Sequence, residues 1–499
     1  MSDQTCTVTI NGVGLEVPRG INVVEAAERA GTEVPHYCYH PGLSVAGNCR
    51  ICLVDIKALS DKQPNPLPKL QIACNTLVQD GMVVETDNDK VRGATRSVLE
   101  FLLINHPIDC PVCDQAGECM LQEYYMDYGG HQSRFGLADK VAKGKVLPVG
   151  PDIMLDQERC ILCTRCVRFL DEVTETHELT IKERGDRSEL CLGAGASVNN
   201  DYATNIVDVC PVGALTSREF RFQKRVWYLE THEAVCTGCA TGCSVNVDSR
   251  QDEIYRIKPR FNPDVNGYWM CDAGRRTHLG NRNGERVEAS LLRSGQKMVE
   301  CATDEAVPIA ARALAGAEPV AILVSADVSL EEGFLLLRLA ERLGGARLLM
   351  LPAEDLGIED DGLLISADRH PNRRGLLDLG FVETEAPPAG VAALLVVRAD
   401  PAAGGGDWPV FLESLAVTTV AADRYGQTAA YADHLLAVGS HFEGQASFMN
   451  RAGLVQSSVA AVSPPGDASA GWALLAALLA EVGGDHYADA AELASAATP

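Results

Sequence analysis

The sequence lacks the features of several protein classes. Its 43 lysines and arginines stand against 68 aspartates and glutamates, a net charge of −25, so it offers no basic surface for a nucleic acid. The longest late apolar stretch, residues 472–482, is too short to span a membrane and contains Glu481. The N-terminus has neither the basic start nor the apolar run of a secretory signal. We therefore expect a chain that binds no nucleic acid and meets a membrane only through partners.

Cysteine and lysine are nearly absent from the second half of the chain. Seventeen of the eighteen cysteines lie at or before Cys271, Cys301 is the last, and no lysine follows Lys297. Residues 301–499 hold ten arginines against 27 aspartates and glutamates, a net charge of −17. In a reducing compartment, so many cysteines indicate metal ligands before disulfides. The change in cysteine, lysine and charge content indicates that two kinds of protein are joined near residue 285. The length of the chain predicts three or more domains.

Short-range patterns in the first half predict small elements around the cysteines. Residues 5–17 alternate in polarity around Asn11-Gly12, which predicts a hairpin, and residues 22–30 form a short helical pattern. Helical periodicity over residues 91–104 stops before Pro107. These elements indicate a small ubiquitin-like ferredoxin domain followed by a helix that leads into the next cysteine group.

The pattern changes after residue 300. Apolar strand-like runs at 319–324 and 392–397 flank a helical pattern at 330–343. Strands that alternate with helices predict an α/β domain built on a parallel sheet. The fold class is therefore α+β in the cysteine-rich half and α/β in the rest.

The first candidate ligand set lies in the strand-rich N-terminal region. Its spacing is Cys38-x10-Cys49-x2-Cys52-x21-Cys74. Thiolates bind iron and bridging sulfide, and the glycines Gly42 and Gly47 let backbone N–H groups approach the sulfurs. The close pair with outlying partners is similar to the plant-type arrangement, although ten residues replace its usual four. We predict a [2Fe-2S] cluster, with a zinc site as the alternative.

The second set, His106-x3-Cys110-x2-Cys113-x5-Cys119, has only three cysteines. A [4Fe-4S] cluster needs four protein ligands, and His106 lies one short loop before Cys110. A neutral imidazole in place of a thiolate would remove one negative charge and shift the reduction potential. From the spacing, His106 as fourth ligand, a three-cysteine cluster and a zinc site all remain open.

The third set, Cys160-x2-Cys163-x2-Cys166-x43-Cys210, carries the most specific pattern in the sequence. Three cysteines at x2 spacing and a distant Cys-Pro are typical of bacterial ferredoxins, in which the Cys-Pro thiolate completes a [4Fe-4S] cluster begun elsewhere in the chain. Cys191 has no companion, so we expect it to be a buried free thiol.

The fourth set is Cys236-x2-Cys239-x3-Cys243-x27-Cys271. The small residues between its members leave room for a third [4Fe-4S] cluster against the backbone. Cys6 and Cys301 remain unassigned and are expected to be structural. The sixteen ligands thus predict one [2Fe-2S] and three [4Fe-4S] clusters, and one-electron centres crowded into about 235 residues indicate electron conduction.

Taken in order, these sets resemble those of one family, the large iron-sulfur subunit of respiratory complex I, the NADH-quinone oxidoreductase. The motifs that carry the resemblance are VPHYCYHPGLSVAGNCRICLVD, NHPIDCPVCDQAGECMLQ, ERCILCTRCVRF with DVCPVGALT, and VCTGCATGCSVNVDSR with GYWMCDAGRR. The resemblance implies that His106 is a ligand. It also implies a peripheral subunit on the cytoplasmic side of a bacterial inner membrane, beside the other peripheral-arm subunits.

In this family, electrons come from NADH through the flavin-bearing subunit and leave to a two-cluster ferredoxin-like subunit on the way to quinone. The resemblance therefore implies a path from the Cys38 set to the Cys160 set to the His106 set, within an NADH:quinone oxidoreductase that pumps protons. The Cys236 set is similar to an extra cluster, usually off the main path, that only some members keep. No substrate active site is expected on this chain.

The region after residue 230 is similar to molybdopterin oxidoreductases. Those enzymes commonly carry a lysine two residues after the last cysteine of the fourth set, where this chain has Ala273, and no cysteine follows Cys301 as a possible metal ligand. We expect a shortened domain that holds no molybdopterin and serves as a scaffold.

The expected domain boundaries follow the ligand sets. They are a β-grasp [2Fe-2S] ferredoxin domain at 1–82, a [4Fe-4S] domain with one histidine and three cysteine ligands at 83–145, a [4Fe-4S] ferredoxin-like domain at 146–228, a molybdopterin oxidoreductase-type [4Fe-4S] domain at 229–285 and the shortened α/β domain at 286–499.

Three alternatives compete with complex I. A catalytic formate dehydrogenase or iron-only hydrogenase can carry the same N-terminal sets, but the hydrogenase needs further cysteine motifs after residue 300, which the sequence lacks. An electron-transfer subunit of a soluble NAD-linked hydrogenase is usually shorter. A scaffold protein held together by zinc ions is the third alternative. It would leave the Cys-Pro pattern of the third set and the histidine of the second set as coincidences.

Overall fold

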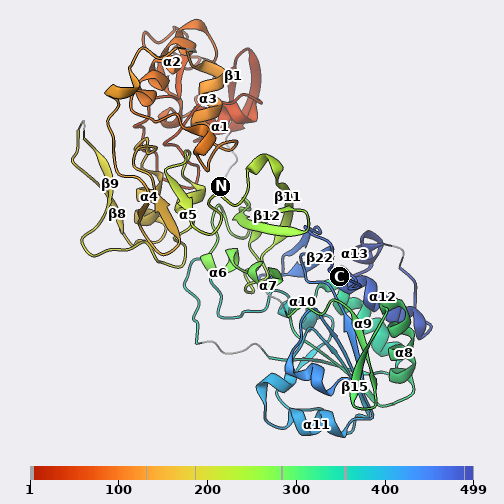
Figure 1. Ribbon diagram of the computed structural model, residues 1–499. Helices are drawn as coiled ribbons and strands as arrows, with labels where there is room; N and C mark the ends of the chain where they lie inside the picture. The colour runs from red at the N-terminus through yellow and green to blue at the C-terminus, as the bar shows by residue number, and fades with distance from the viewer. Residues whose placement is uncertain are drawn as a thin grey trace. The chain divides into compact units, whose positions relative to one another are not determined.

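The computed structural model describes residues 5–130, 132–185, 187–282, 285–352, 357–487 and 489–497. Two compact units make up the chain, Met1–Tyr228 and Leu229–Pro499 (Figure 1). Residues 1–4, which bear on the expected lack of a secretory signal, lie outside the described residues. Within the described ranges, no helix is long and apolar enough to cross a membrane.

The first unit begins with a five-stranded sheet in the order β2-β1-β5-β3-β4. The expected hairpin is confirmed, because β1 and β2 pair antiparallel around Asn11 (φ 49°) and Gly12 (φ 83°), two left-handed residues of the kind that two-residue hairpin turns require. The strands are β1 Thr5–Ile10, β2 Val13–Pro18, β3 Leu53–Ala58, β4 Gln71–Ile72 and β5 Met82–Glu85.

Asparagine caps start both early helices of this unit. The side chain of Asn22 accepts from the Glu25 N–H at the start of α1 (Val23–Arg29), and that of Asn88 accepts from the Val91 N–H at the start of α2 (Asp89–Leu103). Both expected helices are therefore confirmed within two residues. Buried faces of β1, β3, β5 and α1 form one apolar core.

The rest of the first unit consists of short helices and strands joined by loops. A three-stranded sheet has the order β10-β7-β6, and β8 pairs with β9 as a hairpin. The elements are α3 Met120–Tyr128, β6 Leu147–Pro148, β7 Ile153–Leu155, α4 Arg165–Glu172, β8 Leu179–Lys182, β9 Glu189–Leu192, α5 Asn205–Asp208 and β10 Leu215–Ser217.

The second unit opens with an antiparallel sheet, β11-β12-β13, and continues with an eight-stranded sheet in the order β15-β14-β21-β20-β19-β16-β17-β18. Six of the eight strands are parallel, as expected, but the antiparallel hairpin β14–β15 extends one edge, so the sheet is mixed. The strands are β11 Glu230–Val235, β12 Ser244–Arg250, β13 Glu253–Pro259, β14 Ser290–Ser294, β15 Lys297–Cys301, β16 Val320–Val324, β17 Arg347–Met350, β18 Val382–Glu383, β19 Ala393–Val397, β20 Val417–Ala422, β21 His434–Ala437, β22 Ala446–Met449 and β23 Val455–Ser458.

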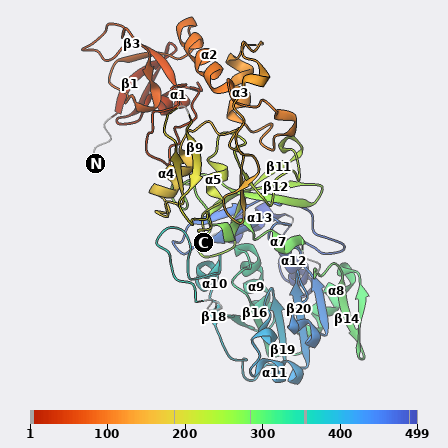
Figure 2. The ribbon, with the colours of Figure 1, turned by 60° about the vertical axis from the view of Figure 1, so that its left-hand side comes forward.

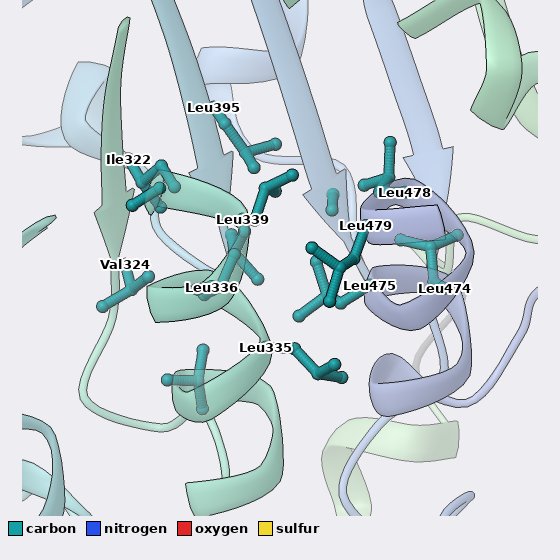
Figure 3. Close-up of a cluster of buried hydrophobic side chains, with 14 of the residues drawn as sticks. Ile322, Val324, Leu335, Leu336, Leu339, Leu395, Leu474, Leu475, Leu478 and Leu479 are labelled. Carbon is teal, nitrogen blue, oxygen red and sulfur yellow. The ribbon is translucent and has the colours of Figure 1, made fainter. Parts of the chain in front are cut away.

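Helices cover both faces of the eight-stranded sheet. Side chains of α8, α9 and α12 pack with Ile322, Val324 and Leu395 on one face, where Figure 3 shows leucines of α9 and α12 directed toward each other. On the other face, Trp408 and Leu412 of α11 pack with Ala321 and Leu323, and Figure 2 places α11 at the far end of the sheet from α13. The helices are α6 Asp272–Arg275, α7 Leu279–Arg282, α8 Thr303–Ala315, α9 Leu330–Arg342, α10 Arg373–Asp378, α11 Trp408–Ser414, α12 Gly471–Glu481 and α13 Ala490–Ala497.

Alternation along β16 explains this two-sided packing. Val320, Ile322 and Val324 point to one face and Ala321 and Leu323 to the other, and all five are buried. A strand apolar on both faces is typical of a parallel sheet between helix layers. Burying each such aliphatic side chain contributes on the order of 1.5–3 kcal/mol, so this core holds the second unit together.

Candidate metal centres

The four cysteines of the first set lie at the rim of the five-stranded sheet. Cys38 and Cys49 lie in the loop between α1 and β3, Cys52 directly precedes β3, and Cys74 lies in a helical turn after β4. The Cys52 and Cys74 sulfurs are 3.5 Å apart. Hydrogen bonds from the Cys49 and Cys74 thiols, and from backbone N–H groups of Cys49 and Asn48, lower the pKa of Cys38. Hydrogen bonds therefore connect the thiols of this set and favour the ionised form of Cys38.

The second set lines a cavity of about 140 Å³. His106, Cys110, Cys113 and Cys119 all face it. Burial lowers the pKa of His106 to about 4, so the imidazole is neutral, which is the form that binds metals. Its Nδ1 is buried and has no hydrogen-bond partner among the described residues. An unpartnered buried nitrogen on a residue that lines the same cavity as three cysteines is compatible with a role as metal ligand.

Gly213 leaves space for this second set. A Cβ at Gly213 would lie 2.5 Å from the Cys113 sulfur and 3.0 Å from Cβ of Gln115. The backbone thus passes so close to the Cys113 sulfur that any side chain at this position would displace that sulfur. A close backbone approach of this kind is what a cluster site needs around its sulfurs.

The third set surrounds a small cavity of about 20 Å³ lined by Cys160, Cys163, Cys166 and Cys210. Leu162 (φ 55°) and Thr164 (φ 66°) adopt left-handed backbone conformations between the first three cysteines. Such residues cost about 1–2 kcal/mol each, and they turn the loop so that successive sulfurs face one cavity. The helix α4 starts directly after this turn and carries Cys166 in its first turn.

Burial and backbone N–H groups set the electrostatics of this third set. Burial raises the pKa of Cys160 to about 11 and that of Cys163 to about 12. Burial also raises the pKa of Cys210, against the opposing effect of N–H groups from Val212, Ala214 and Leu215 that point at its sulfur. These thiols stay protonated until a metal displaces the protons, and the N–H groups would then stabilise the sulfur charge.

The fourth set lies beside the three-stranded sheet of the second unit. Cys236 directly follows β11, Cys243 directly precedes β12, and Cys271 caps α6. The Gly274 N–H donates to the Cys271 sulfur at 3.3 Å. All four cysteines are buried, and burial raises the pKa of Cys236 to about 12.

Glycine again leaves space at this fourth set. A Cβ at Gly274 would lie 2.9 Å from the Cys236 sulfur and 3.4 Å from the Cys271 sulfur. Burial raises the pKa of Cys243, and the ionised forms of Cys236, Cys239 and Cys271 raise it further. Single cavities are lined by all four members of the second set and by all four of the third, and the Cys52 and Cys74 sulfurs of the first set are in contact. The part of the chain that the structure describes contains no group of three or more His, Cys, Asp or Glu side chains already arranged to hold a single metal ion.

The three remaining cysteines lie outside these sets. Cys6 is buried in β1, within the core of the first sheet, and Cys301 ends β15 near Glu305. Cys191 is half-buried on β9, not buried as expected, because among the described residues no third strand pairs with the hairpin β8–β9.

Family models match the chain over most of its cysteine-rich half. They are the 2Fe-2S iron-sulfur cluster binding domain at residues 3–89, the NADH-ubiquinone oxidoreductase-G iron-sulfur binding region at 96–134, the NADH-quinone oxidoreductase subunit 3 ferredoxin-like domain at 150–216 and the NADH-ubiquinone oxidoreductase NDSU1/NuoG-like 4Fe-4S domain at 229–278. A relative in Rickettsia felis, the G subunit of its NADH-quinone oxidoreductase, is 37% identical over 339 residues, which are 68% of this chain and 49% of that protein. The chain is similar to these G subunits of NADH-quinone oxidoreductase.

Similar proteins occur both in bacteria and in mitochondria. The corresponding NADH-quinone oxidoreductase subunit of Streptomyces coelicolor is 37% identical over 66% of this chain and 38% of that protein. The mitochondrial NADH-ubiquinone oxidoreductase 78 kDa subunit of Candida albicans is 39% identical over 62% of this chain and 42% of that protein. The chain spans about half the length, or less, of the curated relatives that it matches.

Two solved structures have weaker likeness. An NAD+-reducing [NiFe]-hydrogenase in its H2-reduced state is 30% identical with a TM-score of 0.38, over 44% of this chain and 91% of that chain. Acetylene hydratase from Pelobacter acetylenicus is 10% identical with a TM-score of 0.35, over 51% of this chain and 69% of that chain.

The family models establish that this chain has both 2Fe-2S and 4Fe-4S binding domains.

Proposed function

We propose that this chain is the iron-sulfur electron-transfer subunit of a proton-pumping NADH:quinone oxidoreductase, relaying electrons from an NADH- and FMN-binding subunit toward quinone. The observation that carries the proposal is the gathering of three ligand sets in one compact unit. Their loops touch one another through hydrogen bonds and close backbone contacts. An iron-sulfur cluster, when bound, takes up and releases one electron.

We assign sixteen side chains as ligands of one [2Fe-2S] and three [4Fe-4S] clusters. The cavity of the His106 set, its orphaned Nδ1 and the glycines beside Cys113 and Cys236 support this assignment. The assigned ligands are Cys38, Cys49, Cys52 and Cys74 for [2Fe-2S], and His106, Cys110, Cys113 and Cys119, then Cys160, Cys163, Cys166 and Cys210, then Cys236, Cys239, Cys243 and Cys271 for the three [4Fe-4S] clusters.

Contacts between loops support an order in which the Cys160 set stands between the other two. The Asn48 side chain, beside Cys49, donates to the Leu162 carbonyl at 3.4 Å. The segment from Cys210 to Gly213 reaches the second set, because the Met120 N–H donates to the Pro211 carbonyl at 3.1 Å and Gly213 lies against Cys113. Electron tunnelling falls steeply with distance, so adjacent sets are favoured partners.

The five expected domains, 1–82, 83–145, 146–228, 229–285 and 286–499, remain part of this proposal. The strand order β2-β1-β5-β3-β4, with β1 and β5 parallel and α1 packed on the sheet, supports a β-grasp fold for the first of them. The third has the short strands and Cys-Pro turn of a ferredoxin-like domain.

We further propose that the α/β domain at 286–499 is a molybdopterin oxidoreductase-like scaffold without a pterin. In doubly wound sheets, ligands bind where the strand order reverses, here at the carboxyl ends of β16 and β19. Arg398 follows β19 and donates to Glu332 at 2.8 Å and to the Gly439 carbonyl at 2.7 Å. Because Glu332 already neutralises this buried guanidinium at the carboxyl end of β19, Arg398 offers no unpaired positive charge to a pterin nucleotide there.

The partners in this proposal are the flavin- and NADH-binding subunit, the two-cluster ferredoxin-like subunit and other peripheral-arm subunits. The location is peripheral, on the cytoplasmic side of a bacterial inner membrane. The alternative, an electron-transfer subunit of a soluble NAD-linked hydrogenase or formate dehydrogenase, is not favoured, because the curated relatives described above bear complex I names.

Native purification tests this assignment. An affinity tag on the chain in its own cell should recover NADH-binding and ferredoxin-like subunits together with NADH:quinone activity, which deletion of the chain should abolish. Recovery of hydrogenase or formate dehydrogenase subunits, with quinone reduction by NADH intact after deletion, would overturn it.

A further inference from the structure

A buried arginine lies among the three ligand sets of the first unit. Arg165 is the first residue of α4, between Cys163 and Cys166 of the third set, and is 6% exposed. Its guanidinium donates to the Val209 carbonyl at 3.2 Å and to the Tyr39 carbonyl. It also lies 4.0 Å from the sulfur of Met120.

Each of these three contacts is next to a different ligand. Tyr39 follows Cys38 of the first set, Met120 follows Cys119 of the second set, and Val209 precedes Cys210 of the third set. One side chain therefore contacts a residue next to a ligand in each of the three sets.

Arg165 has no ordinary counter-ion. Among the described residues, no carboxylate lies within ion-pair distance of its guanidinium, and its Nε has no hydrogen-bond partner. Other buried arginines do have one: Arg286 lies 2.6 Å from Glu443, and Arg159 lies 2.7 Å from Asp109. An unpaired buried charge costs several kcal/mol, so Arg165 needs a compensating negative charge.

Cysteine sulfurs, once ionised, can supply this negative charge. Burial lowers its pKa, while the ionised forms of Cys163, Cys210 and Cys38 raise it. Those three sulfurs belong to the first and third sets, and they are thiolates when they hold iron.

We propose that Arg165 is a positioning residue that serves as the shared counter-ion of these ligand sets and raises the reduction potentials of the clusters they hold. The inference rests on the proposed ligand assignment. Reduction adds one negative charge to a cluster, and a fixed cation in a medium of low dielectric constant favours that added charge. The effect should be largest on the third set, whose loop contains Arg165, and should extend to the first set.

Two substitutions separate the charge of Arg165 from its size and hydrogen bonds. Arg165→Gln keeps N–H donors but removes the charge, and Arg165→Lys keeps the charge. Arg168→Gln is the matched control, because Arg168 lies one turn later on α4 and donates to the Cys38 and Ser44 carbonyls but is half-buried and screened by solvent.

Reduction potentials of the native complex, followed by EPR spectroscopy, provide the readout. Arg165→Gln should lower the equilibrium constant for reduction of the third cluster at least tenfold, which is 59 mV for one electron. Arg165→Lys and Arg168→Gln should stay within about threefold of the natural protein. Unchanged potentials in Arg165→Gln, or an equal shift in Arg168→Gln, would overturn the inference.

Cluster content separates this inference from the ligand assignment. If the natural protein holds no iron-sulfur clusters, the assignment itself fails. If Arg165→Gln loses clusters that Arg165→Lys retains, the requirement for charge is supported. If both variants lose them equally, a packing role explains Arg165 and the inference fails.

Discussion

Alanine at Gly213 should remove one cluster and leave the other three. Gly213 is not among the left-handed glycines, so the backbone accepts alanine. The new Cβ, however, would lie 2.5 Å from the Cys113 sulfur. Non-bonded heavy atoms are most stable about 3.5–4.0 Å apart, so the sulfur must retreat by roughly 1 Å, too far to keep its place in the second set.

Iron content gives the size of this effect. One [2Fe-2S] and three [4Fe-4S] clusters hold about 14 irons per chain, and loss of the second cluster leaves about 10. Iron and acid-labile sulfide should be measured on protein purified anaerobically, with EPR spectra to identify the missing cluster. The spectra of the Cys38 and Cys236 sets should be unchanged.

A second glycine controls for the substitution itself. Gly93 lies in α2, and a Cβ there meets nothing within 4 Å, so Gly93→Ala should keep all clusters and stabilise the helix by up to about 1 kcal/mol. Full iron content in Gly213→Ala would refute the assignment of Cys113 and the reasoning about its close approach.

Three further predictions concern other side chains. His106→Ala should lose about four irons, whereas His106→Cys should keep them and have a lower reduction potential, because a thiolate adds a negative charge; an unchanged potential in the cysteine variant would argue against ligation. Arg398→Met should cost about 3–5 kcal/mol in urea unfolding, because Glu332 stays buried without its partner, while Arg338→Met, at exposed pairs, should cost less than about 1 kcal/mol; equal losses would contradict the burial argument. Burial lowers the pKa of His441 to about 4, below about 6.5 in an unfolded chain, so the unfolded chain binds a proton that the folded chain does not. Stability should therefore fall as pH drops from about 6.5 to about 4, and His441→Gln should lack this part of the fall, which an unchanged pH profile of unfolding would disprove.

Local elements of this fold could be predicted because short stretches of sequence determine them. Asn11 and Gly12 tolerate left-handed backbone and set the first hairpin, and the Asn88 side chain caps α2 where the apolar periodicity starts. The continuous apolar runs at 319–324 and 392–397, separated by a helical pattern, likewise predicted β16 and β19. The edge hairpin β14–β15 was missed, since its residues are polar or half-exposed and carry little periodicity.

Long-range features of the metal centres were not predictable in the same way. Cysteine spacing indicated each set. The role of Gly213, however, depends on a fold that brings this residue against Cys113, 100 residues earlier in the chain. Arg165 stood between two ligands in the sequence, yet its significance comes from Tyr39, 126 residues away. The left-handed residues Leu162 and Thr164 are of types that rarely adopt this conformation, so no local signal marked them.

Spectroscopy of the anaerobically purified protein tests the central claim most directly. Visible absorption, metal analysis and EPR spectra after dithionite reduction should reveal a coloured protein with about 14 irons per chain and signals from one [2Fe-2S] and three [4Fe-4S] clusters. A colourless, zinc-loaded protein without signals after reduction would contradict the claim that this chain conducts electrons.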